Sequence, residues 1–161
     1  MRFTLHGAHL VDATMDVERG NVVVDGAQIQ AIEQSDSQET QIVDATDSII
    51  LPGFIEVHTH GGGGFNLHTT DVEEIDSYRH WIPATGVTSF LVTVVGTPNA
   101  LPEEQLQTAV AAIEQARQHL CEPGAEPVGI FLEGPYISVK KRGAHHRSGC
   151  VFLTKKRLNI F

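Results

Sequence analysis

The sequence predicts an α/β protein in which a small β-rich region precedes a series of parallel βαβ units. Short apolar stretches separated by turn residues fill the first fifty positions, whereas apolar strands alternate with helical periodicity after Pro52. In addition, His58, His60 and Glu133 each lie at the carboxyl end of an expected strand. Because ligands bind at that edge of open parallel sheets, we expect the functional site there.

The first region, residues 1–51, contains short strand candidates and no evident chemistry of its own. The Asp25-Gly26 pair is a tight-turn signal, and the polar stretch 33–41 predicts a loop. The expected strands are 3–5, 8–11, 21–25, 28–32, 42–44 and 49–51.

After Pro52 the expected order is strand, helix, strand, helix, strand, which is the pattern of parallel βαβ units. The strands are 54–60, 87–95 and 128–133, and the helices are 71–82 and 102–120. The β-branched strand 87–95 is expected to be buried on both faces. Apolar residues at helical spacing are expected on the buried side of the second helix: Leu106, Ala109, Val110, Ile113, Ala116 and Leu120.

The pair His58 and His60 is the first candidate for chemistry. Alternate residues of a strand point to the same side, so two imidazoles at the strand end can chelate one cation. The glycines 61–64 that follow allow a sharp turn and close approach of the backbone to a small ligand. The alternative is two structural histidines ahead of a flexible loop.

Glu133 is the second candidate, because an ionisable residue that ends an apolar strand before Gly134-Pro135 is poorly placed for packing. It would complete a His58, His60 and Glu133 ligand set for zinc, iron or manganese. A cation bound there lowers the pKa of water and polarises a carbonyl, which is hydrolytic chemistry. The alternative is a carboxylate that points into solvent.

The composition of this 161-residue chain limits the classes of molecule that it is expected to bind. A net charge of −9 disfavours nucleic acid and anionic membranes, and leaves a small molecule as the expected partner. Cys121 and Cys150 are too few for a disulfide framework, so we expect a cytoplasmic protein. No apolar run approaches the roughly 20 residues that span a bilayer.

Three segments together resemble the amidohydrolase superfamily and, within it, the N-acetylglucosamine-6-phosphate deacetylases. They are PGFIEVHTHGGGG (52–64), GVTSFLVTVVGTP (86–98) and GIFLEGPYISVKKRGAH (129–145). The resemblance covers about residues 1–145. It implies part of a small β-sandwich over 1–51 and the first three βα units of a (β/α)8 barrel over 52–145, truncated before the barrel closes.

The resemblance also implies a reaction and its residues. The reaction is metal-dependent hydrolysis of N-acetylglucosamine 6-phosphate to glucosamine 6-phosphate and acetate, in amino-sugar catabolism, with one or two divalent ions and a homodimeric full-length enzyme. Glu133 matches the metal-binding glutamate, His58 and His60 match a metal-binding pair of some members, and Ala144 and His145 match a substrate loop. Lys140, Lys141 and Arg142 are interpreted as solvated charges.

No catalytic residue is assigned to this chain, because the proton-transferring aspartate of the family lies on a later barrel strand. We therefore expect the chain to be inactive by itself. Two alternatives stay open. One is another metal-dependent amidohydrolase, such as a cyclic-amide hydrolase or a deaminase. The other is a non-catalytic metal-binding fragment.

The tail, residues 146–161, departs from the Pro-Pro-Glu continuation that is common in the family. A single-nucleotide deletion in a hypothetical codon series reproduces His146 to Val151, so our hypothesis is that the tail is an out-of-frame translation. The competing hypothesis is a genuine short protein with a basic tail.

Overall fold

The protein is described from a computed structural model, which defines residues 1–34, 41–96, 101–119 and 122–150. The chain divides into two compact units, Met1–Gly53 and Phe54–Phe161. The expected helical residue Leu120, the residue Cys121 and most of the tail, 151–161, lie outside the described residues.

The first unit is a five-stranded sheet with the order β3-β2-β1-β4, in which β5 also pairs with β1. The expected strands 3–5 and 8–11 form one strand that is interrupted by irregular pairing between Leu5 and Leu10. The described residues of this unit form one sheet, and the expected β-sandwich stays a prediction. The strands are β1 (Arg2–Val11), β2 (Asp16–Asp25), β3 (Gln28–Glu33), β4 (Ile42–Asp44) and β5 (Ile49–Ile50).

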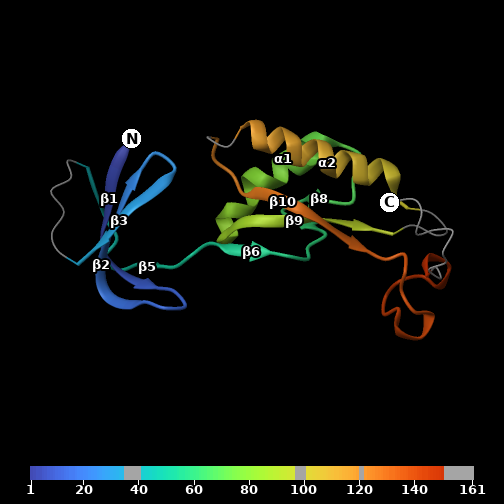
Figure 1. Cartoon of the computed structure of the whole chain (residues 1–161), viewed down its shortest axis with the longest axis horizontal. Helices are drawn as coiled ribbons and strands as arrows, with labels where there is room; N and C mark the ends of the chain where they lie inside the picture. Colours follow the sequence, from blue (N-terminus) through green and yellow to red (C-terminus); the bar gives the residue numbers. More distant parts are fainter. Residues whose placement is uncertain (35–40, 97–100, 120–121, 151–161) are drawn as a thin grey trace. The chain divides into compact units, whose positions relative to one another are not determined.

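The second unit contains a parallel three-stranded sheet with the order β10-β9-β6, and two α-helices pack on it (Figure 1). The expected alternation of strands and helices is confirmed. The elements are β6 (Phe54–Glu56), β7 (Gly61–Gly62), β8 (Phe65–Asn66), α1 (Val72–Trp81), β9 (Val87–Val95), α2 (Glu103–Gln118) and β10 (Glu126–Glu133). The described residues of the unit also contain three short 3-10 helices. They are η1 (Ile82–Thr85), which lies between α1 and β9, and η2 (Val139–Lys141) and η3 (Arg147–Gly149), which lie after β10.

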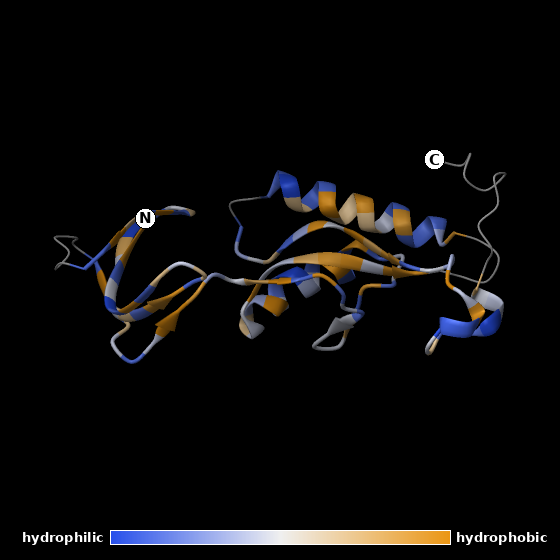
Figure 2. Cartoon of the chain, turned by 60° about the horizontal axis from the view of Figure 1, so that its bottom comes forward, coloured by the Kyte–Doolittle hydropathy of each residue, from blue (hydrophilic) through white to orange (hydrophobic). Residues whose placement is uncertain are grey.

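The core of this unit lies between the sheet and the helices. Phe90, Val92 and Val94 of β9 are fully buried against apolar residues of α1 and α2, and the strands are correspondingly the most hydrophobic part of the unit (Figure 2). The expected burial of β9 on both faces is wrong, because Ser89 and Leu91 on the opposite face are partly exposed. Strand β9 therefore has one continuously buried face, whereas its opposite face is buried only in part.

Both helices lie close to the expected positions. Helix α1 begins at Val72, because the Asp71 side chain caps it by accepting a hydrogen bond of 3.0 Å from the Glu73 N–H. In α2 the buried residues are Thr108, Ala109, Ala112, Ile113 and Ala116. The expected burial of Val110 is wrong, since this side chain is 46% exposed. It lies about 100° around the helix from Ala109, beyond the edge of the buried stripe.

Neither α1 nor α2 has the length and apolar character needed to cross a membrane, and the same holds for the other helices of the described residues.

The first parallel strand is shorter than expected. We predicted a strand over 54–60, but β6 ends at Glu56. There the Glu56 carboxylate accepts a hydrogen bond of 2.9 Å from the His58 N–H, a local bond that competes with strand pairing. His58 and His60 therefore lie in the irregular segment after the strand. Phe54 and Ile55 are 58% and 65% exposed, since β6 is the last strand on its side of the described sheet.

Replacing the Asp71 cap tests this account of α1. We expect Asp71→Ala to lower the free energy of unfolding by about 1 kcal/mol, because the Glu73 N–H loses its acceptor. Asp71→Asn keeps a side-chain oxygen at the same place and should cost a few tenths of a kcal/mol, about the difference between good caps. Urea unfolding followed by circular dichroism compares the three chains. Equal losses for both variants would contradict a capping role.

Candidate metal-binding site

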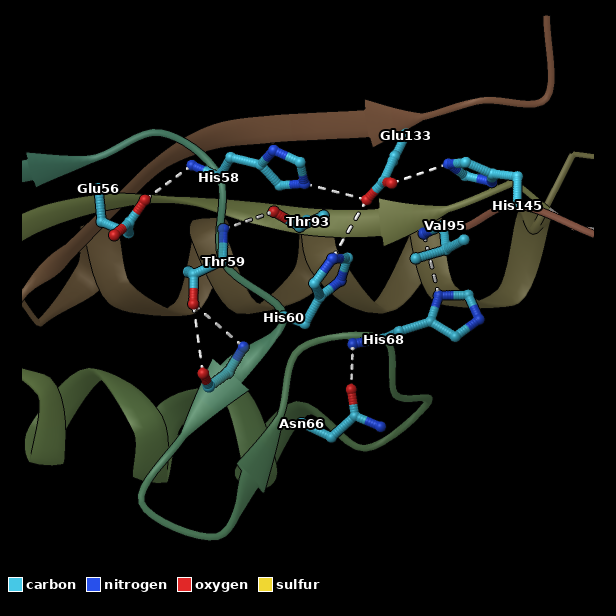
Figure 3. A network of polar contacts seen from close by, with 11 residues as sticks. Glu56, His58, Thr59, His60, Asn66, His68, Thr93, Val95, Glu133 and His145 are labelled. Atoms are coloured by element: carbon cyan, nitrogen blue, oxygen red, sulfur yellow. Dashed lines mark hydrogen bonds and ion pairs between the residues drawn. The ribbon is translucent and has the colours of Figure 1, made fainter. Parts of the chain in front are cut away.

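Three segments meet at the carboxyl end of the parallel sheet, around the carboxylate of Glu133 (Figure 3). Glu133 is the last residue of β10, whereas His58 and His60 follow β6 and His145 follows η2. The Glu133 Oε2 atom lies 3.0 Å from His58 Nε2 and 3.2 Å from His60 Nε2. The other oxygen, Oε1, lies 2.8 Å from His145 Nε2. One carboxylate thus contacts three imidazoles.

The three residues expected to bind metal are brought together. Ligand atoms of His58, His60 and Glu133 all lie within 4.8 Å of one another. Metal–ligand distances of about 2.0–2.2 Å place neighbouring tetrahedral ligands roughly 3.4 Å apart, close to the 3.0 and 3.2 Å that separate Glu133 Oε2 from the two Nε2 atoms. Two imidazoles and one carboxylate are also a donor set of catalytic zinc sites, which keep one position open for water. The residues present therefore fit a divalent ion.

The site is accessible from solvent. The side chains of His58 and His60 are 44% and 58% exposed, whereas that of Glu133 is 24% exposed. An adjoining cavity of about 330 Å³ is lined by His60, Val95, Gly96, Glu133, Ala144, His145, His146 and Gly149. The cavity lies beside the candidate ligands, so a small molecule bound in it would meet the metal-binding atoms. It also includes Ala144 and His145, the two residues expected to contact substrate.

The charge of Glu133 is set by its neighbours. Burial raises the pKa of this carboxyl, but the hydrogen bonds with His58 and His145 and the charge of His60 outweigh burial, so the pKa lies below its ordinary value. Glu133 is consequently anionic at neutral pH. An anionic carboxylate is the form that binds a cation.

The loop that carries His145 is held by Arg142. The guanidinium of Arg142 donates a hydrogen bond to the carbonyl oxygen of His145, and the His145 N–H donates to the Arg142 carbonyl at 3.1 Å. The interpretation of Arg142 as a solvated charge is therefore wrong, whereas Lys140 and Lys141 are exposed. This role could not be predicted from the sequence, because a run of three basic residues does not reveal which of their side chains hydrogen-bonds to the backbone of the same loop.

A second missed residue is Phe131, whose ring stacks on the His58 imidazole with centroids 4.5 Å apart. Phe131 and Glu133 alternate along β10, and alternate residues of a strand share a face. This spacing was the signal in the sequence that could have placed Phe131 beside the site. The stack restricts the orientation of the His58 ring.

The glycines after His60 serve the local fold. They form a small hairpin of β7 and β8 that lies on the indole of Trp81. A Cβ atom at Gly63 would lie 2.3 Å from Trp81 Cε2, and Gly63 adopts a φ of +62°. The close approach of the backbone that Gly63 permits is thus made toward the ring of Trp81.

His68 also lies near this edge. Its Nδ1 atom accepts a hydrogen bond of 3.2 Å from the Val95 N–H at the end of β9. The contact fixes the loop after β8 to the rim of the cavity, since Val95 is one of the lining residues.

Comparison with known proteins agrees with the sequence motifs. No protein-family model matches the chain. It is 30% identical over 131 residues to N-acetylglucosamine-6-phosphate deacetylase of Bacillus subtilis, an alignment that covers 80% of this chain and 33% of the relative. It is 33% identical over 100 residues to N-acetylgalactosamine-6-phosphate deacetylase of Escherichia coli O157:H7, covering 60% of this chain and 24% of the relative.

The fold leads to the same proteins. The crystal structure of N-acetylglucosamine-6-phosphate deacetylase from Pasteurella multocida superposes with a TM-score of 0.79 at 23% identity, covering 99% of this chain and 41% of that structure. The chain spans about a third of the length of the curated relatives that it matches. The predicted resemblance is confirmed: the chain is a homologue of part of the N-acetylglucosamine-6-phosphate deacetylases, which are metal-dependent amidohydrolases.

Proposed function

We propose that this chain forms the metal-binding part of an enzyme that hydrolyses the acetamide group of N-acetylglucosamine 6-phosphate. The observation that carries the proposal is the Glu133 carboxylate, which lies within 3.2 Å of His58 and His60 and beside a cavity that reaches the expected substrate loop. The relatives that support the proposal are named as deacetylases of this sugar phosphate. This chain matches about a third of their length. We propose that the complete reaction also uses residues that this chain does not supply.

A divalent ion held by His58, His60 and Glu133 would activate water and polarise the acetamide carbonyl. We propose zinc, iron or manganese, and three protein ligands are enough for one such ion. The chain's own contribution is charge and orientation. Glu133 supplies the negative charge, and His145 occupies its second oxygen at 2.8 Å, so that Oε2 stays directed at His58 and His60.

The substrate is proposed to enter the cavity beside Glu133, against Ala144 and His145. His145 is largely buried and held in place by Arg142, so its ring is a fixed polar surface rather than a mobile one. Such preorganised polar groups orient a ligand at low entropic cost. We propose no proton-transferring residue from this chain and assign that step to an aspartate outside it.

The 6-phosphate of N-acetylgalactosamine is the second candidate substrate. One homologue of comparable identity carries that name. The two sugars differ only in the configuration of one hydroxyl group, and the ligand set proposed here acts on the acetamide, which they share.

Glu133→Gln tests the metal site. We expect the affinity for Zn²⁺ to fall about 100-fold or more, because the amide carries no charge and the site loses its anionic ligand. The matched control is Glu114→Gln, which makes the same change at an exposed position of α2. Isothermal titration calorimetry measures both variants and the unmodified chain. Equal affinity in all three would overturn the assignment of Glu133 as a ligand.

The same two variants, measured without metal, test how the free energy of unfolding depends on pH. The folded-state pKa of Glu133 lies below its unfolded value of about 4.3, so its contribution to stability is complete above that pH and is lost as the pH falls through the lower folded value. We expect the difference in unfolding free energy between the unmodified chain and Glu133→Gln to persist at pH 5–7 and to shrink below about pH 4. Glu114→Gln should show no such change between pH 7 and 3. If the difference in unfolding free energy between the unmodified chain and Glu133→Gln did not change with pH, the lowered pKa of Glu133 would be contradicted.

Substrate assays test the reaction class. We expect the Zn²⁺-loaded chain to bind N-acetylglucosamine 6-phosphate, with chemical-shift changes at Ala144 and His145 in NMR spectra, and to release no acetate. Hydantoin and dihydroorotate, substrates of other amidohydrolases, should cause no comparable changes. Preferential binding of the cyclic amides would favour the competing class of enzyme. Metal-dependent acetate release by this chain would show that the proposed external aspartate is not required.

A further inference from the structure

We propose that Thr93 is a positioning residue, which holds the backbone between His58 and His60 so that both imidazoles reach Glu133. The inference rests on the proposed metal-binding function of these histidines. Its central observation is a hydrogen bond of 3.1 Å, in which the N–H of Thr59 donates to the Thr93 hydroxyl oxygen. Thr59 is the residue between the two candidate ligands (Figure 3).

The position of this bond follows from the register of the sheet. Pairing of β6 with β9 ends at Glu56 and its partner Phe90. Thr59 and Thr93 are each three residues further along, so their bond continues the same alignment after main-chain pairing has stopped. A side-chain hydroxyl thus replaces the main-chain acceptor that a longer strand would have supplied. It ties the irregular histidine segment to the middle strand of the sheet.

The burial of Thr93 supports a specific role. It lies on the face of β9 where Ser89 and Leu91 are partly exposed, yet Thr93 is fully buried. A buried hydroxyl is costly unless it is hydrogen-bonded, and so is an N–H group that has lost its acceptor. Any rearrangement of the segment 58–60 would break the bond and leave polar groups unpaired. The Thr93 hydroxyl therefore favours one backbone conformation at this point.

The side chain of Thr59 extends the same restraint. Its Oγ1 atom accepts a hydrogen bond of 3.2 Å from the Gly61 N–H, on the far side of His60. It also donates a hydrogen bond of 3.3 Å to the carbonyl oxygen of Gly61. The backbone on both sides of His60 is thus attached through Thr59 to β9. Outer groups that orient metal ligands commonly change metal affinity by about 10- to 100-fold when they are removed.

The decisive test compares Thr93→Val with Thr93→Ser in the complete chain. Valine keeps the branched shape but removes the acceptor, whereas serine keeps the hydroxyl and removes a methyl group. We expect the Co²⁺ affinity of Thr93→Val to fall about 10- to 100-fold, with a changed visible absorption spectrum of the bound ion, because the two histidines lose their fixed spacing. Thr93→Ser should restore the affinity to within about threefold and the spectrum to that of the unmodified chain.

The outcomes separate this inference from the proposed function. If the unmodified chain binds no Co²⁺, both are overturned. If it binds Co²⁺, Glu133→Gln abolishes binding and Thr93→Val binds like the unmodified chain, the metal site stands and the positioning role of Thr93 is refuted. Equal weakening in Thr93→Val and Thr93→Ser would also refute it, since the packing of the side chain rather than its hydroxyl would then matter.

A third variant covers the case in which Thr93→Val does not fold, which thermal unfolding by circular dichroism will reveal. Thr93→Cys has a similar size and offers only a weak sulfur acceptor. We expect its Co²⁺ affinity to lie between those of Thr93→Ser and the Glu133→Gln variant. An affinity equal to that of Thr93→Ser would refute the requirement for a hydroxyl acceptor.

Discussion

Parallel pairing of β6, β9 and β10 is the constraint on which the rest of the second unit depends. Parallel strands direct all their carboxyl ends to one edge of the sheet, so residues that are distant in the chain meet there. His58 and Glu133 are 75 positions apart, yet their side chains are within hydrogen-bonding distance. The helices that connect the strands bury the apolar face of β9 and keep this arrangement in register. The cavity, the histidine contacts and the charge of Glu133 all follow from that convergence.

The candidate site combines one rigid residue with several that lie in loops. Glu133 is part of β10 and takes its position from the ladder with β9. His58 and His60 lie beyond the end of β6, where side-chain contacts rather than strand pairing hold the backbone and the rings. Thr93 binds the backbone between them, and Phe131 stacks on the His58 ring. Sites on strands and helices are more precisely held than sites on loops, which explains why the histidine segment needs these additional contacts.

Much of the architecture could be predicted from the sequence, and the errors have common causes. The bounds of β9 and the order of strands and helices were predicted correctly, because a β-branched run is typical of a buried strand and apolar residues at helical spacing are typical of a helix with one buried side. The length of β6 and the burial of Val110 were not. The first depends on a carboxylate of Glu56 that bonds a backbone N–H two residues later, and the second on the width of the face that α2 presents to the sheet. Arg142 was misread because only the folded loop shows where its guanidinium binds.

By itself, the sequence determined the parallel βαβ order, the family resemblance and the identity of His58, His60 and Glu133 as candidate ligands. These are properties of short contiguous stretches, in which residue type and spacing carry the information. Only the tertiary structure decided that the three side chains meet, that His145 binds the second oxygen of Glu133, and that Thr93 holds Thr59. Contacts of this kind depend on sheet order and on where each strand stops. Both are set by packing between segments that are far apart in the chain, so no local pattern encodes them.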